Sequence, residues 1–223
     1  DAAEAERAGL DAIPIVMITN FFIGAVIAFI GVDLLTDFGA QVFAVQLIGV
    51  AMFREFAVVI ASVLLAGRSA SAFAAEIGSM RISEEIDALE SIAIRPMPYL
   101  VTTRMLAAVI AIVPLYSVSL AANYIACQVM FQLQSGKGAG DYLSYFDSFI
   151  RSQDVLFSFI KVIIFVLLTT FIQCYYGYFA SGGPEGVGVA AGHAIRLAII
   201  VIVFANLIMT LVFWGMSSGV RIS

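Results

Sequence analysis

Long runs without a charged residue dominate this chain, and short polar segments separate them. The uncharged runs are Ala12–Val32, Phe38–Phe53, Phe56–Gly67, Met105–Gly136, Val162–Pro184 and Leu197–Val220. A helix needs about 20 mostly apolar residues to cross a bilayer, because each residue adds about 1.5 Å along the axis. Only Arg54 and Glu55 separate the second run from the third, so we join these two runs into one helix. The pattern predicts five spanning helices, at about 12–32, 42–66, 100–131, 155–180 and 192–217.

The composition agrees with this pattern. Apolar residues make up 62% of the 223 residues and charged residues 12%, whereas a typical soluble domain has about 45–50% and 25%. A chain with so few charges cannot cover its surface in water. The predicted fold class is therefore an all-α polytopic membrane protein, and we treat residues 1–223 as a single transmembrane domain.

The polar ends of the runs predict an orientation. With the N-terminus inside, six Lys and Arg residues lie in inner segments and three in outer segments, which places the C-terminus outside. Residues 1–11 are predicted to be the tail of a polar or interfacial helix that begins further upstream. The first apolar run is too long for a cleavable signal peptide, and an acidic rather than a basic segment precedes it.

Several function classes find no support in the sequence. The net charge is −5 and no basic patch with interleaved aromatic residues occurs, so we expect no nucleic-acid binding. Cys127 and Cys174 lie in apolar runs, which favours small buried side chains over a disulfide or a metal pair. We predict no catalytic residue, metal or cofactor. Because the chain has no G-x-x-x-x-G-K-[ST] motif, energy for uphill transport has to come from a partner or an ion gradient.

Three strong charges fall inside the predicted spans, at Arg54, Glu55 and Lys161. An ionised group at the bilayer centre costs at least about 2.5–3.5 kcal/mol, so each should face protein or a hydrated cavity. Adjacent helical residues point in different directions, which gives Arg54 and Glu55 separate partners, and Lys161 is the candidate for Glu55. Three interpretations stay open: an ion pair that fixes helix packing, a cavity that contacts a polar or anionic headgroup, and a proton or ion relay.

Uncharged polar residues also occur within the spans. Intramembrane amides such as Asn20 and Gln173 usually form hydrogen bonds between helices. Asn206 is the most central of them, so we add it to the candidate substrate-binding residues. Gly24-x-x-x-Ala28 has the small-xxx-small spacing of a close helix contact. The glycine-rich residues 181–192 are predicted to form a loop.

The segment between the second and third spans predicts a short amphipathic helix. Ile82, Ile86, Leu89 and Ala93 fall on one helical stripe, with acidic residues on the other faces and Ser83 as a candidate N-cap. Such a helix could lie on the lipid surface, but an anionic leaflet would repel its four acids. We therefore favour a docking helix for a cytoplasmic protein.

At this point several motifs together resemble a known family. They are Phe53-Arg54-Glu55-Phe56, Ala66-Gly67-Arg68-Ser69-Ala70-Ser71-Ala72, Ala75-Glu76-Ile77-Gly78-Ser79-Met80, Glu84-Glu85-Ile86-Asp87-Ala88-Leu89-Glu90 and Gly186-Val187-Gly188-Val189-Ala190. The chain resembles the MlaE-like permeases, the membrane subunits of ABC transporters associated with MCE-domain proteins. The resemblance covers essentially the whole chain.

The resemblance implies a permease homodimer in the bacterial inner membrane, which passes phospholipid or a related lipid to or from a periplasmic MCE-domain ring. Cytoplasmic ABC ATPase subunits would drive it, often with a STAS-domain accessory protein. The family's cavity charges correspond to Arg54, Glu55 and Lys161. Its coupling region corresponds to residues 69–98, where the candidate docking residues are Glu76, Arg81, Ile82, Glu85, Ile86, Leu89 and Glu90.

Two other functions are weighed against this one. An ion-coupled secondary transporter could use Arg54, Glu55 and Lys161 as its relay, but such transporters usually contain an internal repeat of helices, and five spans show none. A purely structural scaffold has no reason to carry three charges inside its spans. Neither the transported lipid nor the direction of transport follows from the sequence.

Overall fold

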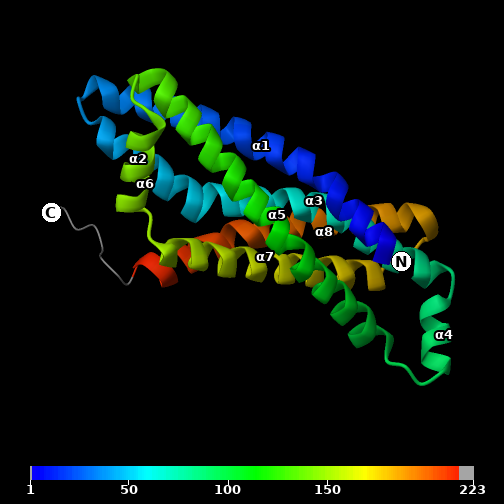
Figure 1. Cartoon of the computed structure of the whole chain (residues 1–223). Helices are drawn as coiled ribbons and strands as arrows, with labels where there is room; N and C mark the ends of the chain where they lie inside the picture. The colour runs from blue at the N-terminus through cyan, green and yellow to red at the C-terminus, as the bar shows by residue number, and fades with distance from the viewer. Residues whose placement is uncertain (1, 216–223) are drawn as a thin grey trace. The chain divides into compact units, whose positions relative to one another are not determined.

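A computed structural model describes residues 2–215, with the side chains of residues 2–12, 41–42 and 69–71 left out of the description. Every regular element in this range is helical (Figure 1). In chain order the elements are α1 (Ala2–Asp37), α2 (Gln41–Ala51), the π-helical turn η1 (Met52–Phe56), α3 (Ala57–Ile82), α4 (Glu85–Ser91), α5 (Pro96–Ser135), α6 (Ala139–Phe149), α7 (Ser152–Tyr178), α8 (Gly183–Thr210) and a second π-helical turn η2 (Leu211–Gly215).

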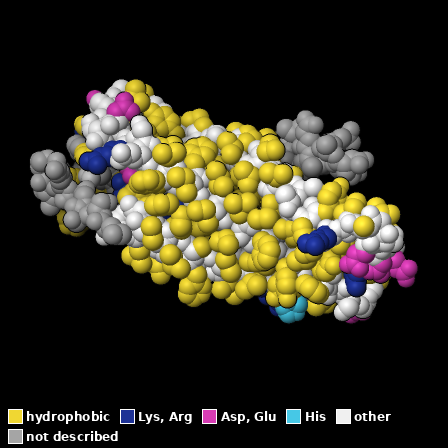
Figure 2. All heavy atoms as spheres, turned by 90° about the horizontal axis from the view of Figure 1, so that it is seen from below, with side chains coloured by type: hydrophobic (Ala, Val, Ile, Leu, Met, Phe, Trp, Pro, Cys, Tyr) yellow, Lys and Arg dark blue, Asp and Glu magenta, His cyan; other side chains and the backbone are white. Residues whose placement is uncertain are grey.

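Five stretches of the described residues are long and apolar enough to cross a membrane, which confirms the predicted number of spans. They are Ile13–Asp37, Phe43–Ile82, Pro96–Ser135, Ser152–Tyr178 and Gly183–Gly215. Helices suit this environment because they satisfy every backbone hydrogen bond within one segment. Hydrophobic side chains cover most of the face drawn in Figure 2, and charged side chains lie towards its margins.

The helices extend beyond the uncharged runs that predicted them. Residues 2–11 continue directly into the first span as part of α1, so no break sets a separate interfacial helix apart from it. The second span reaches Ile82 instead of residue 66. The predicted loop at 181–192 is wrong, because α8 begins at Gly183 with Pro184 in its first turn, where proline fits a helix start. The predicted end of the fifth span at residue 217 lies outside the described residues.

The connection between the third and fourth spans contains a helix that the sequence pattern did not predict. This helix, α6, lies against α2 (Figure 1), where Ile150 at its C-terminal end faces Gly49. Its buried Tyr142 stacks on Phe146, whose ring is 5.1 Å from that of Phe53. Burial also raises the pKa of the Tyr142 hydroxyl. The aromatic side chains of α6 thus pack directly beside η1.

The chain divides into two compact units, which we describe separately. The first comprises the chain up to Ala61 together with Val113–Val162, and the second comprises Ser62–Ile112 together with the chain from Ile163 onward. The helices α3, α5 and α7 contribute residues to both units. The assignment of the whole chain to one transmembrane domain stays a prediction.

In the first unit, α1 and α5 approach closely through a glycine and two amides. The Asn123 amide donates to Oδ1 of Asn20 at 3.0 Å, and a Cβ atom on Gly24 would lie 2.6 Å from Oδ1 of Asn123. Ala28 is fully buried one turn further along. The close contact expected from Gly24-x-x-x-Ala28 and the interhelical role of Asn20 are both confirmed.

In the second unit, α7 packs on α3 at a similar close approach. A Cβ atom on Gly177 would lie 2.8 Å from the carbonyl oxygen of Ala74, and the Gln173 amide donates to the carbonyl oxygen of Ala66 at 3.2 Å. Gln173 therefore bonds between helices as predicted. The thiols of Cys127, in the first unit, and Cys174, in the second, are free and buried, as their apolar surroundings in the sequence predicted.

Candidate functional site

The charged pair Arg54-Glu55 lies in the π-helical turn η1, not in regular α-helix. Wide turns of this kind are rare and often occur at functional sites. Met52 and Phe53 are buried, whereas the Arg54 and Glu55 side chains are 25% and 29% exposed. The turn therefore holds two adjacent charges at the edge of the protein interior, within an apolar span.

Glu55 pairs with Lys161 of α7, which confirms the predicted partner. The Lys161 ammonium lies 3.1 Å from each Glu55 carboxylate oxygen and donates to the carbonyl oxygen of Arg54 at 3.0 Å. The Lys161 side chain has no exposed surface. Because it binds both a side chain and the backbone of η1, Lys161 fixes the turn to α7.

Arg54 pairs with Asp154, a partner that the sequence analysis missed. One guanidinium nitrogen of Arg54, Nη2, lies 3.0 Å from both carboxylate oxygens of Asp154. Asp154 is 5% exposed, stands in the first turn of α7 and accepts the Arg151 backbone N–H at 3.2 Å. A carboxylate is favourable at this end of a helix, because it interacts with the positive end of the helix dipole.

A signal for Asp154 was present in the sequence. It precedes Lys161 by seven residues, a spacing that places both side chains on one helical face. The predicted span begins at residue 155, which places Asp154 in the connection before it. The four charges therefore come as two adjacent residues on η1 and two residues on one face of α7, and their formal charges sum to zero.

Asn206, the fourth predicted substrate-binding residue, lies on α8 in the second unit. Its side chain is half-buried, and its backbone carbonyl oxygen accepts the Thr210 hydroxyl at 2.8 Å. The assignment of Asn206 to the same site as the charges stays a prediction.

The predicted docking helix is shorter than expected. It consists of α4 alone, and Glu84 precedes it in a left-handed conformation with φ of 60° and no side-chain cap. Ser83 as N-cap is therefore wrong, since its backbone N–H still bonds to Ser79 at the end of α3. The predicted stripe is also broken: Ile82 ends α3, and Ala93 lies beyond α4 with φ of 62°.

The candidate docking residues differ widely in exposure. Ile86 is fully buried among residues of its own chain, so it offers no surface to a partner. Leu89 is half-buried. The exposed members of the set are Glu76, Arg81, Ile82, Glu85 and Glu90.

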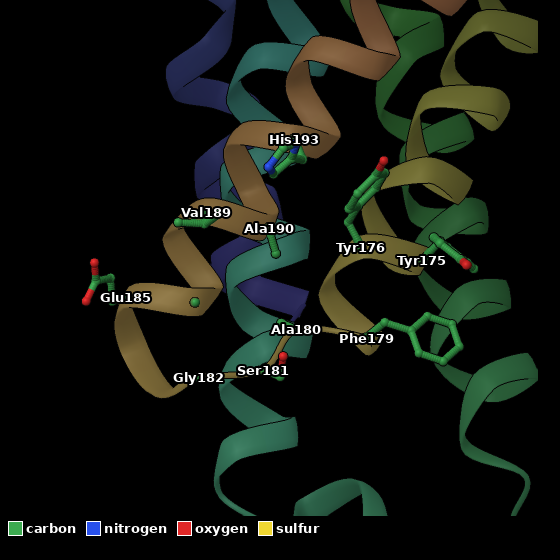
Figure 3. A pocket seen from close by; sticks show the side chains of 11 residues that line it. Tyr175, Tyr176, Phe179, Ala180, Ser181, Gly182, Glu185, Val189, Ala190 and His193 are labelled. Atoms are coloured by element: carbon green, nitrogen blue, oxygen red, sulfur yellow. The ribbon is translucent and has the colours of Figure 1, made fainter.

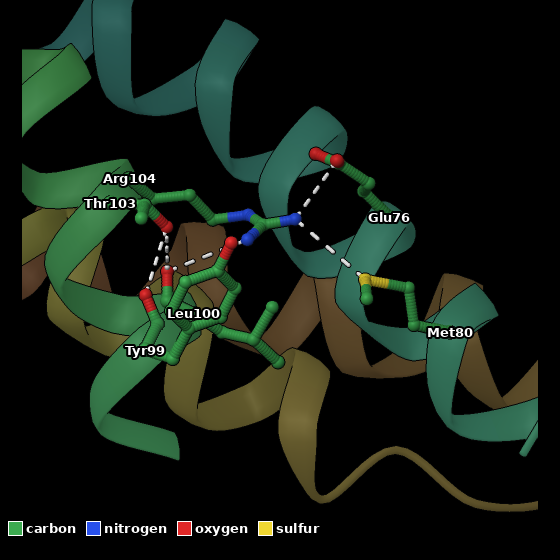
Figure 4. A network of polar contacts seen from close by, with 6 residues as sticks. All are labelled: Glu76, Met80, Tyr99, Leu100, Thr103 and Arg104. Carbon is green, nitrogen blue, oxygen red and sulfur yellow. Dashed lines mark hydrogen bonds and ion pairs between the residues drawn. The ribbon is translucent and has the colours of Figure 1, made fainter. Parts of the chain in front are cut away.

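Two of these residues form ion pairs within the second unit. Arg104 of α5 reaches Glu76 of α3 at 2.9 Å and the Met80 sulfur at 3.9 Å (Figure 4). Arg81 pairs with Asp87 of α4 at 2.8 Å, and its guanidinium lies 6.0 Å from the ring centroid of Tyr178. Ion pairs thus connect α3 with both α5 and α4.

A pocket of about 530 Å³ lies between the end of α7 and the start of α8 (Figure 3). The rings of Tyr176 and His193 are parallel in it, with centroids 6.2 Å apart and planes inclined by 8°. The Glu185 and Tyr175 side chains point away from this pair (Figure 3). The pocket therefore brings no cluster of charged groups together.

A comparison of the whole sequence with protein families identifies the family of this five-span chain. The family model described as Permease MlaE matches residues 2–212. The chain belongs to the MlaE permease family. As an MlaE permease it is a membrane transport subunit, which confirms the resemblance found in the sequence.

Individual relatives of this MlaE permease come from bacteria and a plant. A probable ABC transporter permease protein of Rickettsia prowazekii is 30% identical over 206 residues, which cover 92% of this chain and 80% of the relative. The intermembrane phospholipid transport system permease protein MlaE of Haemophilus influenzae is 29% identical over 208 residues, 93% of this chain and 80% of that protein. The chloroplastic protein TRIGALACTOSYLDIACYLGLYCEROL 1 of Arabidopsis thaliana is 27% identical over 94% of this chain and 60% of its own length.

Proposed function

We propose that this chain is the permease subunit of an ABC transporter that moves phospholipid or a related lipid between the bacterial inner membrane and a periplasmic MCE-domain protein. The observation that carries the proposal is the cluster of four charges inside two apolar spans of an MlaE permease. The name of the Haemophilus influenzae relative, an intermembrane phospholipid transport permease, supports the substrate class.

Arg54 is the proposed contact for the lipid phosphate. A guanidinium matches a phosphate with two parallel hydrogen bonds, which a lysine ammonium cannot do. A quarter of the Arg54 side chain is exposed, so an anionic headgroup can reach it. Asp154 holds the same guanidinium when no lipid is bound, and the phosphate displaces this carboxylate on binding.

Glu55 and Lys161 have a different part in this proposal. Lys161 has no exposed surface and is engaged by the Glu55 carboxylate and the Arg54 carbonyl oxygen, so it positions the turn and does not contact the headgroup. Glu55 keeps the local charge neutral, which prevents the site from holding an anion permanently. Asn206 is retained as a further lipid contact, because an amide can donate to a headgroup ester or phosphate oxygen.

We further propose that two copies form the functional unit. In α8, 11% of the most apolar window is buried within the chain, compared with 33–44% in the other four spans. Bulky residues such as Val203, Phe204 and Leu207 are more than half exposed. Lipid can solvate such a face, so its exposure leaves it available to a second copy but does not require one. The resemblance to MlaE-like permeases, together with the prevalence of two-fold symmetry among homo-oligomers, carries the proposal of a dimer with the lipid cavity between the protomers.

The remaining partners are those that the resemblance to MlaE-like permeases implies. The chain has no phosphate-binding loop, so separate cytoplasmic ABC ATPase subunits hydrolyse ATP and dock near α4, with a STAS-domain protein as accessory. The N-terminus and α4 lie on the cytoplasmic side, and the C-terminus lies on the periplasmic side with the MCE-domain ring.

Lipid retention by two variants of the cluster tests the proposal. Arg54→Ala should lower the lipid that co-purifies with the complex by about ten-fold, the loss expected for one charge-assisted pair. Asp154→Asn should raise the retained lipid and slow its transfer between labelled donor and acceptor vesicles, because the competing carboxylate charge is gone.

Arg151→Ala is the matched control, since it removes an exposed guanidinium three residues from Asp154. It should leave lipid content and transfer unchanged. If Arg54→Ala retains full lipid and full transfer, the cluster serves helix packing alone and the proposed phosphate site is wrong.

A further inference from the structure

The short helix α4 is bounded at both ends by strained backbone. Glu84 precedes it with φ of 60° and Ala93 follows it with φ of 62°. In the described part of the chain, these two are the non-glycine residues with positive φ. Side chains with a Cβ atom disfavour this conformation, so it persists only where surrounding contacts hold it. Packing contacts of α4 with the rest of the second unit must therefore stabilise its position.

One side chain of α4 provides this anchor. Of its seven residues, all of them described, only Ile86 is buried. Ile86 packs in a cluster with Ile77 of α3, Leu100 and Val101 of α5, and Cys174 of α7. Through this cluster, the one buried side chain of α4 is linked to residues of three membrane-spanning helices.

Partly buried side chains complete the packing around the Ile86 cluster. Met80, Met97 and Met105 pack against the cluster together with Tyr178. Methionine side chains fill irregular gaps, so they complete the packing around the cluster and leave Ile86 little room to move on its own. The nearby Arg81–Asp87 pair is exposed and constrains α4 only weakly.

We propose that Ile86 is a positioning residue that transmits a displacement of α4 to α3, α5 and α7, and that it makes no contact with the partner. This inference rests on the proposed function, in which an ATPase docks near α4. Close-packed side chains have little room to compress, so a moving α4 carries its anchor and the anchor pushes the three helices. Exposed residues of α4 hold the partner, and Ile86 passes on the movement.

The experiment measures lipid transferred per ATP hydrolysed by the reconstituted complex of permease dimer and ATPase. Ile86→Ala should keep the ATPase bound and its hydrolysis within about two-fold of the unmodified complex, while transfer per ATP falls about ten-fold. Ile86→Val removes one carbon but retains the branched side chain, so its transfer per ATP should fall only about two- to three-fold. Ile92→Ala is the matched control, because Ile92 is 65% exposed just beyond α4, and its transfer per ATP should not change.

Two results would overturn the inference. One is an Ile86→Ala complex whose transfer per ATP equals that of the unmodified complex, and the other is loss of the ATPase from this variant. If Ile86→Ala yields no folded dimer, Ile86→Val decides: a two- to three-fold lower ratio supports transmission and an unchanged ratio contradicts it. An unmodified chain that neither binds an ATPase nor transfers lipid would instead contradict the proposed function.

Discussion

Two ion pairs of similar length occupy very different settings in this chain. Lys161 and Glu55 lie 3.1 Å apart, and the lysine is fully buried, whereas Arg81 and Asp87 lie 2.8 Å apart with both side chains more than 40% exposed. Water and salt screen the exposed pair, while the buried ammonium has exchanged its hydration for protein partners. Removing one partner should therefore cost far more at the buried lysine than at the exposed pair, although the exposed pair is the shorter one.

The largest effect expected from this comparison is that of removing Lys161. Lys161→Met leaves the Glu55 carboxylate without its buried cation and should destabilise the protein by about 3 kcal/mol, measured as a fall in melting temperature. Adding Glu55→Leu should restore much of this loss, because the double variant has no uncompensated charge at this position.

Lys137→Met is the matched control for Lys161. The Lys137 side chain is half-buried and lies over the Tyr145 ring, outside the spans. Its removal should change stability by no more than about 0.5 kcal/mol. Equal melting temperatures for Lys161→Met and Lys137→Met would show that burial of a lysine does not determine how much stability its removal costs.

The second expected effect is on the association of the ATPase with α4, the helix that carries Asp87 of the exposed Arg81–Asp87 pair. Leu89→Asp places a charge on the half-buried side of α4 and should weaken ATPase association by at least about 2 kcal/mol, the loss typical of an interface hot spot. Melting of the permease dimer should hardly change. Leu143→Asp on α6 introduces the same charge at a residue that is 48% exposed, and it should leave the ATPase bound. Normal co-purification of the Leu89→Asp complex would exclude this part of α4 from docking.

The smallest expected effect is that of breaking the exposed pair. Arg81→Ala should cost less than about 1 kcal/mol of stability, and the difference should shrink further at high salt. Melting temperatures in low and high salt measure this. A salt-independent loss as large as that of Lys161→Met would contradict the contrast between the two pairs.

The sequence predicted the number of spans and the Glu55–Lys161 pair for the same reason. Charged residues are rare in lipid because they are costly there, so long uncharged runs indicate the spans. The few charged residues inside the spans are expected to form ion pairs with one another. The ends of the helices were not predictable in this way, because backbone hydrogen bonding continues past the apolar region, as in α3 and α8.

The missed features depend on backbone geometry. The π-helical turn at Arg54 has hydrogen bonds between residues five apart, not four apart as in an α-helix. This local change does not alter the hydrophobic periodicity of the sequence, so the pattern could not predict it. The same periodicity joined Ile82, Ile86 and Leu89 into one stripe, although left-handed Glu84 interrupts it. The helix α6 was missed because its acidic and serine residues resemble those of a loop.

The neutrality of the cluster formed by Arg54, Glu55, Asp154 and Lys161 also bears on the membrane potential. A full charge that crosses the bilayer changes its energy by about 2.3 kcal/mol per 100 mV. Arg54, Glu55, Asp154 and Lys161 carry two positive and two negative formal charges, so a shift of the intact cluster moves no net charge through the field. A conformational change that shifts only this intact cluster therefore does no electrical work against the membrane potential.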